Sequence, residues 1–418
     1  MRIPRPARLI VIAAVLATAV SLTAPDGANA GRCFLLFECP PVASPPAAPG
    51  APDSTSPLPV PPSPIPVPPA GPPVPAPPGN PGCEPRPRRT SGWLVGAGDV
   101  VSASARDRRC TLATMAASGV RIVRSSFLWS QIERAPRQFD FAFYDRYVEQ
   151  LARYRMRVLP VLFGTPGRYS VAPKSRYPDR VQPRSGVTFG RFAAAVARRY
   201  GPKGSFWRQH PSVPRLPIRS WQIWNEPNVS FFWSPRPSAR RYSQMLAVAS
   251  RAIKRVDRKA EIVAGGLAES RFGISISKYL RALYRNRGAR WFDTVALHTY
   301  SRSAGSGVAI VERTRALMNR HGDRRARIWV TEFGWATGGP AHGFKTSERG
   351  QAARVRQTLR TIYRRRARLR ARGAIYSFWS DPPPYRSDFW GLHVGLHRRD
   401  GRPKPAARAF RQVASRLR

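Results

Sequence analysis

The chain has 418 residues and a formal net charge of +48, because 71 lysines and arginines outnumber 23 aspartates and glutamates. This length exceeds what one hydrophobic core usually serves, so we expect one folded domain with accessory segments. No nucleic-acid-binding motif accompanies the charge, which argues against a nucleic-acid partner. No stretch beyond the N-terminus is long and apolar enough to cross a bilayer, which argues against a transmembrane protein.

The N-terminus has the pattern of a secretory signal peptide. Three arginines lie within the first eight residues and precede an apolar run over 9–22, and small residues at 28–30 suit cleavage after Ala30. A transmembrane anchor is the alternative, but this 14-residue run is shorter than the ~20 residues that span a bilayer. We therefore expect residues 1–30 to be removed and the protein to be secreted, either free or associated with the cell wall.

Residues 31–82 combine a short cysteine-containing segment with a linker. The stretch 40–81 is dominated by proline, mixed with alanine, serine, valine and glycine. Such a composition cannot bury a core, so it predicts an extended, disordered linker ahead of the folded domain.

The four cysteines are Cys33, Cys39, Cys83 and Cys110, and they suit an oxidising compartment. They show no Cys-x-x-Cys spacing of the kind that binds zinc. Pairing Cys33 with Cys39 and Cys83 with Cys110 is the simplest of the three connectivities that four cysteines allow. We expect the cysteines to form structural disulfides.

The arginine excess has two interpretations. It could attract an anionic partner such as an acidic polysaccharide, a wall polymer or a lipid surface. It could equally reflect a composition rich in arginine, alanine, proline and glycine, with the arginines on solvated helix faces. The sequence leaves both interpretations open.

A regular alternation of strands and helices begins near Thr90. Eight apolar segments, each followed by a helical segment, predict a (β/α)8 TIM barrel over residues 83–418, and we expect it to be a monomer. An open doubly wound sheet is disfavoured because no glycine-rich phosphate loop follows an early strand. The expected strands are 93–97, 120–125, 157–163, 218–224, 261–267, 294–298, 328–332 and 374–379.

Two of these strands deliver a glutamate at their C-terminal ends. The strand 218–224 runs into Asn225 and Glu226, and Pro227 predicts that it stops at Glu226. The strand 328–332 ends in Glu332. Active sites of TIM barrels lie at the C-terminal ends of the strands, so these carboxylates should meet. Two such carboxylates perform glycoside hydrolysis, and we expect Glu226 to be the proton donor and Glu332 the ionised nucleophile.

Further candidates lie near the same strand ends. Arg124 and Tyr300 could keep Glu332 ionised, Asn225 could bind a substrate hydroxyl, and tryptophans could offer flat faces to a sugar ring. A lone histidine is more often structural, and the tryptophans could equally be core residues. No cluster of His, Asp and Glu has ligand spacing, so we predict neither metal nor cofactor. The substrate-binding candidates are Arg124, Asn225, His298, Tyr300, Trp379, Trp129 and Trp335.

The motifs resemble glycoside hydrolase clan A, whose members are retaining TIM-barrel enzymes. Trp-Asn-Glu-Pro-Asn at 224–228 is similar to the acid/base motif of that clan, and Thr-Glu-Phe-Gly-Trp at 331–335 to its nucleophile strand. The region from Arg124 to Asp145 resembles the second-strand region of families 39, 42 and 5. The chain is most similar to family 39 and to the cellulase-like, family 5-type members.

This resemblance implies double displacement through a glycosyl-enzyme intermediate, with Glu226 as acid/base and Glu332 as nucleophile. It also implies that Arg124, Asn225, His298, Tyr300 and Trp379 line the sugar subsite at the cleaved bond. One departure is that the third strand ends in residues 163–166, Phe-Gly-Thr-Pro, where family 5 enzymes usually place a histidine.

The sequence thus predicts a secreted retaining glycoside hydrolase that cleaves β-glycosidic bonds of a polysaccharide or oligosaccharide. The alternatives are a non-catalytic carbohydrate- or cell-wall-binding protein on the same barrel, and a transglycosylase. A closed groove, or a carboxylate held in an internal ion pair, would favour the binding protein.

Overall fold

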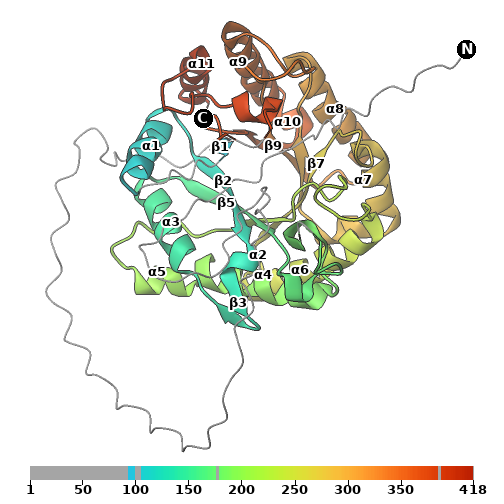
Figure 1. Cartoon of the computed structure of the whole chain (residues 1–418). Helices are drawn as coiled ribbons and strands as arrows, with labels where there is room; N and C mark the ends of the chain where they lie inside the picture. Colours follow the sequence, from blue (N-terminus) through green and yellow to red (C-terminus); the bar gives the residue numbers. More distant parts are fainter. Residues whose placement is uncertain (1–92, 99–104, 176–177, 385–386, 418) are drawn as a thin grey trace, which may run out of the picture.

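The computed structural model describes residues 93–98, 105–175, 178–384 and 387–417, and its eight parallel strands close into a barrel surrounded by helices (Figure 1). This confirms the predicted (β/α)8 architecture. The predicted signal peptide and linker, together with Cys33, Cys39 and Cys83, lie outside the described residues. The barrel strands are β1 Leu94–Gly98, β2 Ile122–Leu128, β5 Arg157–Phe163, β6 Ser220–Ile223, β7 Glu261–Ala268, β8 Thr294–His298, β9 Arg327–Glu332 and β10 Ala371–Tyr376.

Each strand pairs in parallel with its neighbours, in the order β1-β10-β9-β8-β7-β6-β5-β2 around the barrel. The strands β3 Glu133–Ala135 and β4 Gln138–Phe139 form a small antiparallel hairpin beside β2. The outer helices are α1 Ala105–Ala117, α3 Ala142–Arg153, α4 Gly186–Tyr200, α6 Ala239–Val256, α7 Ile276–Arg285, α8 Ala304–Arg320, α9 Glu348–Arg364 and α11 Pro405–Ala414, and the shorter ones are α2 Trp129–Ile132, α5 Ser205–Gln209 and α10 Arg366–Leu369.

Serine side chains define where several outer helices begin. Ser185, Ser238, Ser303 and Ser347 precede α4, α6, α8 and α9, and each accepts a hydrogen bond from a backbone N–H in the first turn. An N-cap of this kind satisfies a donor that has no partner within the helix. The local sequence therefore sets these helix starts.

Most strand boundaries agree with the sequence prediction, and one difference affects the site. The strands β5 and β8 have the predicted bounds, whereas β6 ends at Ile223 and not at Glu226. The backbone of Trp224 and Glu226 is left-handed, with φ of 69° and 44°, and this conformation cannot continue an extended strand. The carboxylate of Glu226 is therefore carried by a tight loop just beyond β6.

The lower part of the barrel interior is apolar. One buried side chain from each of seven strands forms this layer: Leu94, Ile122, Leu159, Val263, Ala296, Trp329 and Ile375. Above this layer, toward the C-terminal ends of the strands where active sites of this fold lie, the interior holds polar and charged side chains such as Arg124 and Gln222. Among the described residues, no helix combines the length and apolar character needed to cross a membrane.

Gly98 allows the end of β1 to approach the chain just after β10. A Cβ at this position would lie 1.8 Å from the backbone oxygen of Ser377. We predict that Gly98→Ala lowers the free energy of unfolding by about 2 kcal/mol or more, because the barrel must open locally to relieve the clash. Chemical denaturation measures this change. Gly167→Ala is the matched control, since a Cβ there meets no atom within 4 Å, and equal stabilities of the two variants would contradict the prediction.

Candidate active site

Glu226 lies in a loop with a strained backbone, and hydrogen bonds from Asn228 anchor this loop. Its φ of 44° is unusual for a non-glycine residue and lies next to the similarly strained Trp224. The side-chain amide of Asn228 donates to the backbone oxygens of Ala268 and Ile274, both at 2.7 Å, and ties this loop to the end of β7 and to the chain after it. The side chain of Glu226 is thereby held in one direction, toward the centre of the barrel mouth.

Glu332, the last residue of β9, is surrounded by hydrogen-bond donors. Arg124 donates from Nη1 to Oε1 at 2.7 Å, and the hydroxyl of Tyr300 lies 2.9 Å from Oε2. The Tyr300 hydroxyl also lies 2.6 Å from the hydroxyl of Ser377, which follows β10. Residues from β2, β9 and the ends of β8 and β10 thus converge on one carboxylate.

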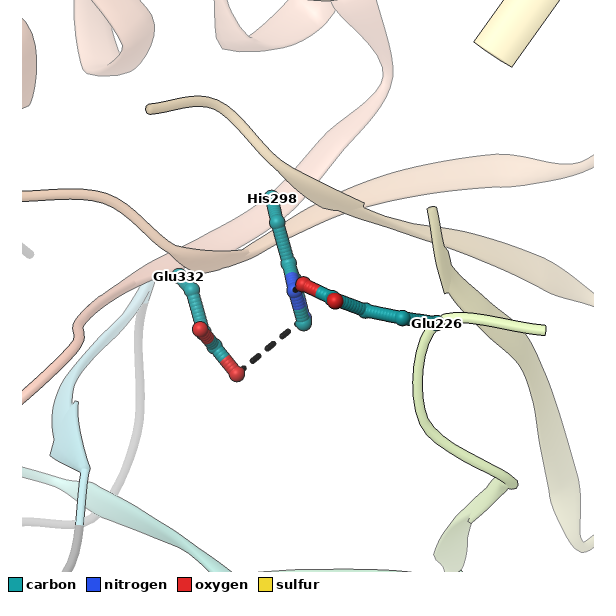
Figure 2. Close-up of side chains that lie close together, drawn as sticks. All are labelled: Glu226, His298 and Glu332. Atoms are coloured by element: carbon teal, nitrogen blue, oxygen red, sulfur yellow. Dashed lines mark hydrogen bonds and ion pairs between the residues drawn. The ribbon is translucent and has the colours of Figure 1, made fainter. Parts of the chain in front are cut away.

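His298 lies between the two glutamates (Figure 2). Its Nδ1 is 2.6 Å from Oε1 of Glu226, and its Nε2 is 3.3 Å from Oε1 of Glu332. Oxygen atoms of the two carboxylates lie within 4.8 Å of one another. The structure therefore brings together the two glutamates that the sequence places at separate strand ends.

Gly266 makes room for this histidine. It has a φ of 78° in a bulged part of β7, and a Cβ there would lie 2.9 Å from Nε2 of His298 and 2.9 Å from the amide nitrogen of Gln222. A side chain at this position would therefore displace the histidine that contacts both glutamates.

Arg124 connects the site across the barrel. It is the third residue of β2, which runs on to Leu128, so it lies within the strand and not near its end as predicted. Its Nε donates to the side-chain oxygen of Gln222 at 2.9 Å, and its Nη2 donates to that of Asn225 at 2.6 Å. Both side-chain oxygens thus accept from the same guanidinium. The amide nitrogen of Asn225 makes no hydrogen bond within the described residues and is available to donate to a ligand.

The two buried glutamates differ in what surrounds them. Burial and the charge of Glu332 raise the pKa of Glu226 well above its ordinary value, against a smaller opposing effect of Arg124. Burial also raises the pKa of Glu332, but Arg124 and Tyr300 stabilise its charged form and oppose the rise. Burial and the positive charge of Arg124 lower the pKa of His298 well below its usual range, so this imidazole is neutral at neutral pH. The proton of the pair therefore belongs on Glu226.

The three tryptophans proposed as sugar platforms are core residues. Trp129 is fully buried, with its ring stacked on Tyr169 and on Phe192. Trp335 is buried and donates to the backbone oxygen of Ser301 at 2.8 Å.

Trp379 lies three residues beyond β10 and is buried against His397 and Phe410, the latter on α11. A stacking platform needs an exposed ring face. None of the three has one, which corrects the prediction.

The sequence did not single out several residues that complete the site. Gln222, within β6, contacts Arg124, and Ser377, directly after β10, contacts Tyr300. Each is a polar residue in a largely apolar stretch of sequence. The ring of Trp390 lies against Tyr300 with centroids 5.0 Å apart, and its indole nitrogen is buried without a hydrogen-bond partner. The alternation of polar and apolar residues in 220–223 is the one signal that could have indicated Gln222.

Glu226, His298 and Glu332 could in principle each offer one ligand atom to a metal ion. However, Arg124 already donates to the Glu332 oxygen that faces His298, so a second cation would be repelled there. The prediction of no metal therefore remains our expectation for this site.

Comparisons with known proteins establish the fold. No protein-family model and no curated protein sequence matches the chain. Similar solved structures include a family 39 glycoside hydrolase from Bacteroides cellulosilyticus WH2, with a TM-score of 0.58 and 17% identity over 82% of this chain and 66% of that chain.

Two further solved structures are similar to the chain. A monomeric β-xylosidase from Caulobacter crescentus CB15 has a TM-score of 0.58 and 18% identity over 77% of this chain and 68% of that one. A family 39 enzyme from Xanthomonas axonopodis pv. citri has a TM-score of 0.56 and 18% identity over 77% and 66%. The chain shares the barrel fold of family 39 glycoside hydrolases. It spans about two thirds of the length of these three structures.

The raised pKa of Glu226 predicts a pH-dependent gain in stability on neutralising it. The folded protein binds this proton more tightly than the unfolded chain, so wild type loses stability as pH rises above the unfolded value of ~4.3. We predict that Glu226→Gln raises the free energy of unfolding at pH 7 by at least about 1.4 kcal/mol, the equivalent of one pKa unit, and has little effect near pH 4.

Denaturation at both pH values measures this gain. The matched control is Glu149→Gln, because Glu149 lies at the surface of α3 in an ion pair with Arg153, and such pairs contribute at most about 1 kcal/mol. A gain for Glu226→Gln that is the same at both pH values would contradict the burial argument.

Proposed function

We propose that this protein is a retaining glycoside hydrolase that cleaves β-glycosidic bonds. The observation that carries the proposal is the pair Glu226 and Glu332, in which one carboxylate oxygen of each lies within 4.8 Å of the other. Retaining glycosidases have carboxyl groups about 5–5.5 Å apart, whereas inverting ones need about 6.5–9.5 Å to admit a water. The short separation therefore favours double displacement.

In the first step, Glu332 attacks the anomeric carbon as Glu226 protonates the leaving oxygen. The carbon–oxygen bond to the leaving group breaks, a carbon–oxygen bond to Glu332 forms, and the proton of Glu226 moves to the departing alcohol. In the second step, Glu226 takes a proton from water, whose oxygen displaces Glu332. Each step inverts the anomeric carbon, so the product retains the configuration of the substrate.

The contacts of His298 place the acidic proton where this step needs it. The Nη2 of Arg124 can only donate and lies 3.4 Å from Nε2 of the neutral imidazole, which favours the tautomer in which Nε2 accepts and Nδ1 carries the hydrogen. Nδ1 then donates to Oε1 of Glu226. The other carboxyl oxygen, Oε2, makes no hydrogen bond within the described residues and can carry the proton toward the glycosidic oxygen.

Neighbouring groups support the transition state. The Asn225 amide is oriented by Arg124 and can donate to the substrate 2-hydroxyl, a bond that strengthens as positive charge develops on the sugar. Tyr300 holds Oε2 of Glu332 and releases it as that carboxylate becomes an ester.

A carbohydrate-binding protein is the second candidate, because Glu332 forms an internal ion pair with Arg124. The same ion pair is what an ionised nucleophile requires, and a binding protein has no need of a second carboxylate with a raised pKa beside it. We therefore favour the enzyme. A transglycosylase shares the first step and differs only in using a sugar as acceptor.

Secretion is part of the proposal and rests on the signal-peptide pattern of residues 1–30. The similar structures named as β-xylosidase and glucosidase make β-linked neutral sugars the first substrates to test. We also propose that the protein acts as a monomer.

A panel of aryl β-glycosides and polysaccharides tests the reaction directly. We predict that Glu332→Ala abolishes turnover, and that azide restores it with formation of a glycosyl azide of inverted configuration, because the small anion replaces the missing nucleophile. With Glu226→Ala, azide should yield an azide of retained configuration. Lack of turnover with every substrate, together with binding that both variants retain, would identify the protein as a carbohydrate-binding protein. Oligosaccharides longer than the substrate would identify the transglycosylase.

The pH profile of kcat/KM tests the roles of the two glutamates. We predict a bell shape, in which the acid limb reports protonation of Glu332 and the alkaline limb reports loss of the Glu226 proton. Tyr300→Phe should move the acid limb to higher pH, since it removes a group that stabilises the charged form of Glu332. An acid limb that stays in place in Tyr300→Phe would contradict this assignment.

A further inference from the structure

A strongly basic cavity lies at the end of the barrel opposite to Glu226 and Glu332. It has a volume of about 760 Å³ and is lined by residues at or just before the starts of several barrel strands. Leu94, Ile122 and Arg157 begin β1, β2 and β5, and Arg327 begins β9. Because the strands are parallel, their starts lie at the mouth remote from the proposed active site.

The lining of this cavity has an excess of positive charge. It contains nine lysines and arginines but three acidic residues, which are Glu261, Asp293 and Asp323. Each acidic side chain is already occupied. Glu261 accepts from Ser220 at 2.7 Å and from Thr294 at 2.6 Å.

Asp293 accepts from Lys254 at 3.0 Å and from a backbone N–H at 2.8 Å, and Asp323 accepts from Tyr284 at 2.9 Å. Glu261 also pairs with Arg372 at 3.5 Å, and Arg219 pairs with Asp257, outside the lining, at 3.2 Å. Nine cations against three acids leave the lining with a formal excess of six positive charges.

Several cations in the cavity have no partner within the described part of the chain. The buried Nε of Arg157 makes no hydrogen bond, and its guanidinium is close enough to Arg372 for the like charge, together with burial, to lower its pKa. The exposed side chains of Arg258, Arg325 and Arg327 make no hydrogen bond or ion pair with other described residues. Like charges gathered on a rigid wall are unfavourable unless a counter-charge joins them.

The basic surface continues into a second cavity of about 580 Å³. This cavity shares Arg327, Arg370 and Arg372 with the first, adds Arg366, and has no acidic residue in its lining. The two cavities together suit an elongated ligand with repeated negative charges better than a single small anion.

We propose that these two cavities form a binding site for an anionic polysaccharide, whose carboxylate or phosphate groups pair with the arginines. The planar guanidinium matches the geometry of both groups. A membrane surface is a poorer fit, because the exposed large apolar side chains of the described residues, Val171, Val187 and Phe272, do not line either cavity. Single-stranded nucleic acid is also a poorer fit, because the lining aromatic residues Trp93 and Phe292 are buried and offer no face for base stacking.

This site would hold the protein on an anionic polymer while leaving the opposite end of the barrel open. It does not depend on the proposed hydrolase activity. It gives part of the arginine excess a local function that the sequence alone could not assign.

The test measures binding of the full secreted chain to two probes, polygalacturonate for carboxylate groups and linear polyphosphate for phosphate groups, with neutral dextran as the reference. The variant Arg325→Gln/Arg327→Gln removes two exposed charges from the cavity. The control Arg240→Gln/Arg349→Gln removes two exposed charges from the first turns of α6 and α9, at the other end of the barrel.

We expect the cavity variant to bind at least one probe about tenfold more weakly and the control to change less than twofold, with binding that falls steeply between 50 and 300 mM salt. The probe that is affected identifies the charged group. Equal losses in both variants would overturn the proposal in favour of diffuse surface charge. It would also be overturned by unchanged affinity of the cavity variant for both probes.

If the double variant fails to fold, Arg258→Gln provides the same test. It removes a single exposed cation that makes no bond within the described residues. Its expected loss is about threefold, against no loss for Arg240→Gln. Unchanged binding by Arg258→Gln would overturn the proposal.

Discussion

The contacts of the Arg124 guanidinium are the interaction on which the rest of the site depends. It holds the nucleophile candidate Glu332 charged, orients the amide of Asn225 through its oxygen, and is itself fixed by Gln222. Burial, together with the charge of Arg124, lowers the pKa of His298 and keeps it neutral. The three acceptors of this largely buried cation come from β6, from the loop just beyond it and from the end of β9, which meet at the C-terminal mouth of the barrel.

The chemical difference between the two glutamates follows from this one cation. Both are buried, and burial alone would favour two neutral carboxylic acids. The Arg124 contact stabilises the charge of Glu332, and that charge in turn discourages ionisation of Glu226. One acid and one nucleophile thus arise from identical side chains because the donors lie on one side of the site.

The sequence predicted the barrel and the meeting of its two glutamates, because strand periodicity and the C-terminal rule for barrels are local and topological properties. It did not predict that β6 ends at Ile223, since the left-handed backbone of Trp224 is imposed by tertiary contacts. It misassigned Trp129, because an indole at a strand end gives no sign of whether its ring faces solvent or the helices outside. Gln222 was missed because its role depends on a partner 98 residues away.

The central claim, that Glu332 forms a covalent bond to the sugar, can be tested by trapping that intermediate. With a panel of 2-deoxy-2-fluoro aryl β-glycosides that carry an activated leaving group, the second step is slower than the first, so the ester accumulates. Peptide mass spectrometry then locates the modified residue. The account predicts one added sugar on the peptide that contains Glu332, in wild type and in Glu226→Gln when the leaving group is activated. A sugar attached to another residue, or turnover of the panel without any adduct and with inverted products, would contradict it.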